Sequence, residues 1–426
     1  MKALTRSVLA ALLLALLAAA GVVAWQFRAV DDPLADRPPP PLTRELSARG
    51  AYLARAANCA GCHTAPGGAP YAGGPAIATP FGATHASNLT PDDETGLGRW
   101  TPADFWRALH HGRSKDGRLL YPSFPYTAYT RMPREDADAL FAYLKGLPPV
   151  KQANRPHDLR FPYDTQAALA AWRALYFRPG VFEPDPARPA EWNRGAYLVR
   201  GPGHCVACHG TRNALGAPTG PVEFGGGPMP GGGWHVPSLH DPAEGAVIGW
   251  KTEEITALLG TGISDRASVA GPMAEVVHDS TQHLSPPDLR AMAVFLQSLP
   301  PVTVAAAGRG GIEADTTQLA RGATRYGEHC AACHGDAGEG APGAYPPLAG
   351  NRALTMQSSA NAIRAVLLGG FPPSTAGNPR PYGMPPFAAV LDDADIAAVL
   401  SYVRASWGNR ASAVAPHEVD RQRRGR

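Results

Sequence analysis

The chain carries little charge for its length, and this shortage excludes some kinds of partner. Its 426 residues include 39 Lys and Arg against 36 Asp and Glu, a formal net charge of only +3. Nucleic-acid-binding domains carry dense, clustered basic surfaces, so we expect no nucleic acid among the partners. Charged residues make up 18% of the chain, whereas 47 Gly and 44 Pro indicate long turns and irregular segments.

Cysteine is also scarce, and no cysteine is left outside one repeated pattern. The six cysteines form three Cys-x-x-Cys-His sequences at residues 59–63, 205–209 and 330–334. Cysteines at positions i and i+3 project from one face of a helical turn, where both thiols can reach one edge of a porphyrin. The adjacent His can then present its imidazole to the iron. We therefore predict three covalently bound haem c groups.

The predicted haem-binding residues follow directly from this pattern. The thiols that would attach the haems belong to Cys59, Cys62, Cys205, Cys208, Cys330 and Cys333, and the proximal iron ligands are His63, His209 and His334. Disulfides would form short, strained loops and leave the three His unexplained. Zinc requires sets of four ligands, whereas each site offers one Cys pair and one adjacent His. A thioredoxin-type pair seldom carries the His three times.

A long apolar run occurs at the N-terminus. No charge interrupts residues 8–25, which follow Lys2 and Arg6, so residues 1–28 resemble an export signal. Two interpretations stay open: cleavage near Ala18–Ala20, or an uncleaved anchor, since a run of about 18 residues can span a bilayer. We favour the anchor, with the rest of the chain on the periplasmic side of the bacterial cytoplasmic membrane.

The sequence around each haem site is repeated as well. An amphipathic helix that begins near Arg-Gly-Ala precedes each site, at residues 49–51, 194–196 and 321–323. A shorter helix is expected after Trp100-Thr101-Pro102, after Trp250-Lys251-Thr252 and at 361–368. A strongly periodic helix closes each repeat, with its apolar face at 137–144, 289–296 and 396–403. This order is typical of a small helical cytochrome c domain.

These repeats predict an all-α protein of three tandem cytochrome c domains with long Gly/Pro-rich loops, plus an N-terminal membrane or signal helix. The expected segments are the signal or anchor (1–28), domain 1 (42–150), a connecting strap (151–189), domain 2 (190–302), domain 3 (315–408) and a basic tail (409–426), of which residues 421–426 are expected to be solvated. We refer to 42–150, 190–302 and 315–408 as the first, second and third module.

The opposite side of each iron needs its own ligand, and methionine is the candidate. Met132, Met273 and Met384 occupy equivalent places, expected to be loops, before the three closing helices. A thioether opposite His favours the reduced iron and closes the site to small molecules. Met292 and Met356 are more typical of core side chains. Three closed haems would relay electrons and would have no catalytic residues.

Several longer strings carry a family resemblance, which covers residues 44–404. They are Asn88-Leu89-Thr90-Pro91-Asp92, Thr95-Gly96-Leu97-Gly98-Arg99-Trp100, Leu120-Tyr121-Pro122, Phe124-Pro125-Tyr126, His278-Asp279-Ser280-Thr281-Gln282 and Ser406-Trp407-Gly408-Asn409. With them the chain resembles the three-haem cytochrome c subunit of bacterial membrane-bound alcohol, gluconate and aldehyde dehydrogenases. Many members have Met where this chain has Phe124, which leaves Met132 as the candidate ligand of the first haem.

The resemblance implies an electron-transfer subunit with no catalysis of its own on the substrate. Its expected partners are a catalytic dehydrogenase subunit (a quinoprotein, flavoprotein or molybdoprotein), ubiquinone or a downstream cytochrome or oxidase, and the inner membrane. Two other functions stay open. One is a haem enzyme of the peroxidase or reductase type, which would need an open haem. The other is a cytochrome c associated with an oxidase, or a free periplasmic shuttle.

Overall fold

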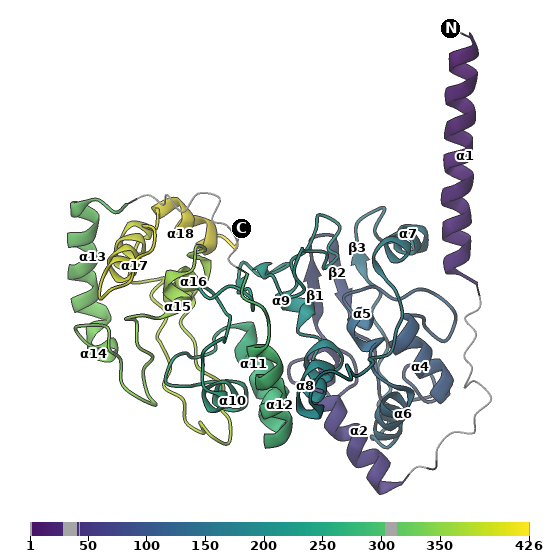
Figure 1. Ribbon diagram of the computed structural model, residues 1–426, viewed down its shortest axis with the longest axis horizontal. Helices are drawn as coiled ribbons and strands as arrows, with labels where there is room; N and C mark the ends of the chain where they lie inside the picture. The colour runs from purple at the N-terminus through teal and green to yellow at the C-terminus, as the bar shows by residue number, and fades with distance from the viewer. Residues whose placement is uncertain (1, 29–40, 42, 303–312, 426) are drawn as a thin grey trace. The chain divides into compact units, whose positions relative to one another are not determined.

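The computed structural model describes residues 2–28, 41, 43–302 and 313–425 (Figure 1). It forms two compact units. The first contains Met1–Glu183, Arg200–His204 and Ala214–Ala217, and the second contains Pro184–Val199, Cys205–Asn213 and Pro218–Arg426. The second and third modules therefore share most of one unit. The boundaries of the three modules stay a prediction.

The first unit is mainly helical, with one small sheet. Its elements are α1 (Lys2–Gln26), α2 (Arg44–Ala56), α3 (Cys59–His63), β1 (Ala76–Thr79), β2 (Gly82–His85), α4 (Pro102–His111), α5 (Tyr126–Tyr129), α6 (Arg134–Lys145), β3 (Asp158–Leu159) and α7 (Gln166–Tyr176). The three strands are antiparallel in the order β1-β2-β3, and Ala76 pairs with His85.

The second unit contains the remaining elements. They are α8 (Ala190–Arg200), α9 (Val206–His209), β4 (Gly227–Pro228), β5 (His235–Val236), α10 (Thr252–Thr261), α11 (Pro272–Asp279), the 3₁₀ helix η1 (Thr281–His283), α12 (Pro286–Gln297), α13 (Thr316–His329), α14 (Ala331–His334), α15 (Arg352–Thr355), α16 (Ala360–Leu368), α17 (Asp393–Ala405) and α18 (Pro416–Arg423). The mainly helical fold that the sequence predicts is thus confirmed.

A close crossing between the first and the closing helix recurs in all three modules. A Cβ on Gly50 would lie 1.9 Å from the carbonyl oxygen of Ala139, and one on Gly322 would lie 2.2 Å from that of Ala398. In the second module, Gly195 approaches Ala291 in the same way, at 1.9 Å. Only glycine leaves room for this approach, which explains why the repeated Arg-Gly-Ala string contains it.

The arginine of the same string also has a structural role. Arg194 donates to both carboxylate oxygens of Asp288 on α12, at 2.8 and 2.7 Å. In the third module Arg321 donates to Asp395 on α17 at 2.9 Å, and in the first Arg49 pairs with Asp136 on α6. Each pair ties the same two helices together beside the glycine crossing.

The short helix expected after Trp100 begins as the sequence predicts. The side chain of Thr101 accepts from the amide of Asp104 at 3.1 Å, and the carboxylate of Asp104 accepts from the amide of Thr101 at 3.0 Å. This reciprocal capping box and Pro102 in the first turn start α4. The corresponding helices α10 and α16 also form, and α6, α12 and α17 close the modules.

Two segments contain more structure than the sequence indicated. The strap contains β3 and α7, whose buried Leu169 and Ala170 pack with Leu119. The basic tail contains α18 at residues 416–423, while Arg421, Arg423 and Arg424 are exposed. Val419 on this helix is completely buried against the third module, and the side chains of Glu418 and Arg423 bond to Ser359 and Asp393. One apolar side chain and several polar contacts thus hold a mostly charged helix in place.

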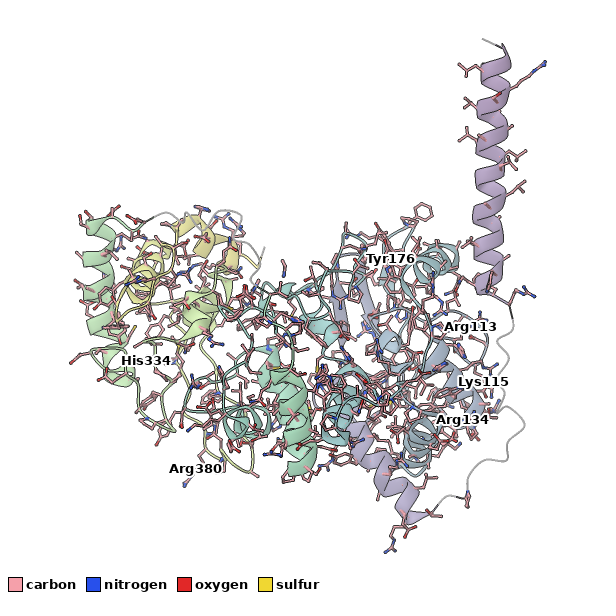
Figure 2. The ribbon with its side chains drawn as sticks, in the orientation of Figure 1. Arg113, Lys115, Arg134, Tyr176, His334 and Arg380 are labelled. Atoms are coloured by element: carbon pink, nitrogen blue, oxygen red, sulfur yellow. The ribbon has the colours of Figure 1, made fainter. Side chains whose placement is uncertain are left out.

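Helix α1 forms where the N-terminal anchor was expected. Near its C-terminal end Val23 packs beside Leu119 and Leu169. Arg113, which lies near this end in Figure 2, donates to the carbonyl of Arg28 at 2.7 Å and also to that of Gln26. These bonds satisfy carbonyls that a helix end leaves unpaired. Across the described residues, no helix is both long enough and apolar enough to cross a membrane. The predicted membrane helix is therefore not supported.

Candidate functional site

Each Cys-x-x-Cys-His sequence occupies a single helical turn that follows the first helix of its module. The turns are α3, α9 and α14, and the first cysteine of each pair is half-buried while the second is exposed. Asn58 and His204, which directly precede the first two turns, have positive φ angles of 47° and 36°. This left-handed residue redirects the chain, so that the turn does not continue the preceding helix.

The six cysteines are thiols with no disulfide among them. Burial, and secondarily the neighbouring cysteine of the pair, raises the pKa of Cys59 and Cys205 to about 12 and that of Cys330 to about 11. Within the described ranges, no group of three or more His, Cys, Asp or Glu could hold a metal ion.

Each of the three predicted proximal histidines makes the same kind of hydrogen bond, from its Nδ1 atom to a main-chain carbonyl. The Nδ1 atom of His63 lies 2.6 Å from the carbonyl oxygen of Ser87, that of His209 lies 2.8 Å from Pro237, and that of His334 lies 3.0 Å from Pro346. A carbonyl can only accept, so Nδ1 must carry the proton. The Nε2 lone pair is then available for an iron.

Burial also keeps these imidazoles neutral. It lowers the pKa of His63, His209 and His334 below the ordinary value, and the hydrogen bond to the carbonyl opposes this effect only in part. A metal ligand must be the neutral imidazole. His334, labelled in Figure 2, therefore has the same ligand chemistry as the other two.

Met132 lies at the centre of the first module. Its side chain is completely buried in a cluster that includes Leu53, Tyr129 and Leu140, and Cys59 packs against the same cluster. The turn between α5 and α6 places it there, since its amide donates to the carbonyl of Tyr129 at 2.9 Å. The structure thus brings the first haem site and its candidate thioether into one apolar core.

Met273 lies in a helix, where the sequence placed a loop. The expected loop before the closing helix contains α11, with Pro272 at its first position and Met273 in its first turn. Proline favours this position because its missing N–H is not needed there. The Gly271 that precedes it packs against the indole of Trp234. The side chain of Met273 is half-buried.

Met384 is held by its main chain. Its amide donates to the carbonyl of Gly370 at 2.8 Å and its carbonyl accepts from Gly370 at 3.0 Å, an isolated antiparallel bridge. The side chain is half-buried and outside the core cluster of the third module, although Phe387 contacts that cluster. Met292 and Met356 are each 3% exposed, as core side chains would be.

The carbonyl acceptors behind the histidines escaped sequence reasoning. They are main-chain atoms 12 to 28 residues away from the His, so no side chain identifies them. A weak signal exists, because Pro237 and Pro346 both follow a glycine-containing loop after the haem site. Any residue type can supply a main-chain carbonyl, whereas the position of that carbonyl depends on the conformation of the whole loop.

The arrangement fits a covalently bound haem. Each site offers two thiols on one turn and a neutral imidazole with Nε2 available. In the first and third modules the same turns pack against apolar clusters through Cys59 and Cys330. An apolar macrocycle held on one edge and ligated from one side requires these features.

Comparison with known proteins agrees with this fit. The cytochrome c family model matches residues 47–148 and 319–407. The chain is 39% identical to the cytochrome c subunit of a quinone-type alcohol dehydrogenase from Gluconacetobacter polyoxogenes, over 86% of this chain and 81% of that protein.

Two further relatives have other partners. The cytochrome c subunit of gluconate 2-dehydrogenase from Pantoea cypripedii is 36% identical, over 86% of this chain and 87% of that protein. The cytochrome subunit of fructose dehydrogenase from Gluconobacter japonicus is 33% identical, over 90% of this chain and 83% of that protein. The chain therefore belongs to the family of cytochrome c subunits of bacterial dehydrogenases, which are electron-transfer proteins that bind haem c.

Proposed function

We propose that this chain carries three haem c groups and relays electrons from a catalytic dehydrogenase subunit to ubiquinone or another component of the respiratory chain. The observation that supports it most directly is the threefold occurrence of a thiol pair beside a neutral imidazole whose Nδ1 is occupied and whose Nε2 is available. Haem, when bound, takes up and releases one electron at a time at its iron.

The residues of the chain have distinct roles in this proposal. Cys59 and Cys62, with their counterparts in the other modules, attach the macrocycle, and the three histidines bind the iron from one side. Met132, Met273 and Met384 bind it from the other side. With a His and a Met both bound to the iron, no position would be left for a substrate, so the chain would pass electrons on and perform no chemistry on the substrate.

The partner and the location extend the proposal. The relatives serve alcohol, gluconate and fructose dehydrogenases, which supports a catalytic dehydrogenase subunit that could be a quinoprotein, a flavoprotein or a molybdoprotein. The apolar run after Lys2 and Arg6 supports export to the periplasmic side of the cytoplasmic membrane. The direct acceptor is ubiquinone or a downstream cytochrome or oxidase.

Co-purification tests this function. A tagged chain is isolated from detergent-solubilised membranes of its natural host, the bound catalytic subunit is identified, and candidate substrates are added while haem absorbance is followed. We expect three haems per chain in a pyridine haemochrome assay and full reduction by one substrate class. A chain that reacts with peroxide or another small molecule without any partner would instead indicate a haem enzyme.

A matched pair of variants tests the haem sites themselves. Replacing Cys205 and Cys208 with Ala should reduce the haem content by one third. Replacing His240 with Ala should leave it unchanged, because His240, although buried in the same module, directs Nδ1 at the carbonyl of Pro300 (2.8 Å) and follows no cysteine. An unchanged haem content in the double Cys variant would contradict the second site.

A further inference from the structure

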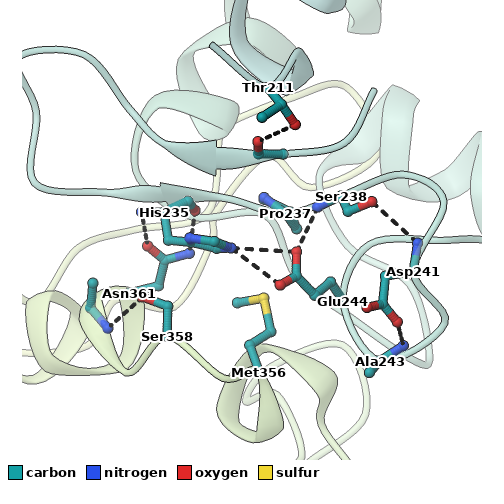
Figure 3. Close-up of polar contacts among 12 residues, drawn as sticks. Thr211, His235, Pro237, Ser238, Asp241, Ala243, Glu244, Met356, Ser358 and Asn361 are labelled. Atoms are coloured by element: carbon teal, nitrogen blue, oxygen red, sulfur yellow. Dashed lines mark hydrogen bonds and ion pairs between the residues drawn. The ribbon is translucent and has the colours of Figure 1, made fainter. Parts of the chain in front are cut away.

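The peptide group behind His209 is bonded on both sides. The carbonyl of Pro237 accepts from Nδ1 of His209 at 2.8 Å, and the N–H of the same peptide, that of Ser238, donates to Oε2 of Glu244 at 2.7 Å. Figure 3 shows Glu244 bonded to Ser238 beside Pro237. One peptide unit thus connects a carboxylate to the histidine that is the predicted ligand of the second haem.

The carboxylate of Glu244 is held firmly in this position. The Nε2 atom of His235 lies 3.3 Å from each of its oxygens, and the side chain of Glu244 is only 16% exposed. Burial raises the pKa of Glu244, but the bonds from His235 and Ser238 outweigh it, so the pKa lies below its ordinary value. The group therefore carries its negative charge at neutral pH.

The third module fixes the segment that contains this peptide. The side-chain amide of Asn361, at the start of α16, accepts from the N–H of His235 at 2.8 Å and donates to its carbonyl at 2.7 Å. Both bonds are visible in Figure 3. A single side chain thus pairs with His235 as a neighbouring strand would, two residues before Pro237.

The equivalent peptide differs in the other two modules. In the first module, the N–H that follows the Ser87 carbonyl belongs to Asn88 and donates to the neutral amide oxygen of Asn154 at 2.7 Å. In the third module, the carbonyl of Pro346 is followed by Pro347, which has no N–H. The acceptor of this N–H is thus a carboxylate in the second module and an amide oxygen in the first, and the third module has no such N–H.

This gradation has a predictable electronic effect. Hydrogen bonds in a chain polarise one another, and a charged acceptor makes a bond roughly twice as strong as a neutral one. A carboxylate on the N–H therefore makes the carbonyl a stronger acceptor for the imidazole Nδ1–H. The imidazole becomes more basic at Nε2 and favours the oxidised iron over the reduced iron.

We propose that Glu244 is a positioning residue that lowers the midpoint potential of the haem at the second site through the Pro237–Ser238 peptide. The same device acts more weakly through Asn154 at the first site and is absent at the third. This inference rests on the proposed function, because it requires a haem that is attached to Cys205 and Cys208 and ligated by His209. A different acceptor behind each proximal histidine would give the three haems different midpoint potentials, although the three histidines have the same ligand chemistry.

Spectroelectrochemical titration of the full-length chain tests the proposal. Glu244→Gln keeps the size of the side chain and an oxygen that can accept from Ser238, but removes the charge. We expect one of the three midpoint potentials to rise, with a shift of up to about tenfold in the equilibrium between reduced and oxidised haem, or about 59 mV for one electron. The reciprocal change, Asn154→Asp, should lower the potential of the first haem.

Glu254→Gln is the matched control. Glu254 lies in the same module and accepts from a main-chain N–H, that of Lys251 at 2.8 Å, but that peptide has no bond to a proximal histidine. Its substitution removes the same charge and should move the second potential much less. Equal shifts from Glu244→Gln and Glu254→Gln would overturn the proposal, because they would indicate a general charge effect.

The haem assay separates the two levels of failure. If the unsubstituted chain lacks a haem at Cys205 and Cys208, the proposed function fails before any potential is measured. If all haems are present and Glu244→Gln leaves the potentials unchanged, only the inference fails. If Glu244→Gln does not fold, Asn154→Asp still decides the question, and an unchanged first potential in that variant overturns the proposal.

Discussion

The first and third modules share one frame and differ in how they hold the methionine that is the candidate second ligand. In both, a glycine of the first helix lies against a carbonyl of the closing helix, Gly50 on Ala139 and Gly322 on Ala398. In the first module, however, Met132 is completely buried among core side chains, whereas in the third Met384 is half-buried and clamped through its main chain to Gly370.

This difference separates two requirements of a haem site. The frame holds the Cys-x-x-Cys-His turn, and the same crossing serves both modules. In the proposed function the opposite side has to direct a thioether to the iron, and we expect that either a packed side chain, as at Met132, or a bridged main chain, as at Met384, can do this. We therefore expect substitutions to be tolerated better around the methionines than at the glycine crossing, where a Cβ would meet a carbonyl oxygen.

Blocking the shared crossing should have the largest effect. Gly50→Leu and Gly322→Leu would each force a side chain into the carbonyl of the facing helix, and we expect the affected module to lose its fold and its haem. Haem content per chain, measured by pyridine haemochrome, should fall by one third in either variant. Both variants should behave alike because the crossing is the same.

Gly327→Leu provides the control for that experiment. Gly327 lies on α13, the helix that contains Gly322, but a Cβ there would meet nothing within 4 Å. Leucine is a better helix former than glycine by up to about 1 kcal/mol, so the free energy of unfolding should stay equal or rise. Loss of haem in this variant would show that helix α13 tolerates no bulk anywhere.

Removing the candidate thioethers should affect the stability of the first and third modules differently. Met132→Ala and Met384→Ala should each abolish the visible charge-transfer absorption of one methionine-ligated ferric haem. Met132→Ala should also lower the free energy of unfolding by about 2 kcal/mol or more, because a fully buried side chain leaves a cavity. Met384→Ala should cost less, since its side chain is half-buried.

Met292→Ala is the matching control. Met292 is 3% exposed in the second module, so its loss should destabilise the protein much as Met132→Ala does, without any spectral change. If Met132→Ala reproduces only the behaviour of Met292→Ala, with an unchanged spectrum, Met132 is a core residue and the first haem has another distal ligand.

The smallest effect concerns the ion pair beside the crossing in the third module. Burial raises the pKa of Asp395, but the hydrogen bond from Arg321 and the nearby positive charge outweigh it, so the pKa lies below its ordinary value. The stability from this pair is therefore present above the unfolded pKa of about 3.9 and is lost as the pH falls through the folded value.

Asp395→Asn should accordingly destabilise the chain at neutral pH by less than about 1 kcal/mol, because Arg321 is 42% exposed and water screens the pair. Urea unfolding at several pH values should show the difference from the unsubstituted chain shrinking below about pH 4. In an Arg321→Gln background the same substitution should cost less. A difference that grows in acid would contradict the sign of this linkage.

Sequence reasoning located the parts that depend on local pattern. The apolar faces around Leu140 and Val399 predicted the closing helices, and Thr101 with Pro102 predicted the start of α4, because these signals lie within the element itself. The haem-binding turns were found for the same reason. The assignment of Met132, Met273 and Met384 as ligands stays a prediction.

The parts that escaped prediction depend on distant contacts. Pro272 fits a loop as well as the first position of a helix, so only packing decides that Met273 lies in α11. Helix α18 is mostly charged, and it is held by Val419, buried against the third module, and by contacts such as that of Arg423 with Asp393. The Glu244 bond to Ser238 spans only six residues, but the irregular loop that brings the two groups together carries no pattern in the sequence.

The pairing of Asn361 with His235 has a practical consequence for dividing the protein. An amide side chain that satisfies both main-chain groups of a residue over 100 positions earlier in the sequence leaves both partners incomplete when the chain is cut between residues 302 and 315. A second module expressed alone would expose the N–H and carbonyl of His235, and its loop would lose its outer support. The second and third modules are therefore better produced as one polypeptide, and domain-swap chimaeras between relatives should exchange them together.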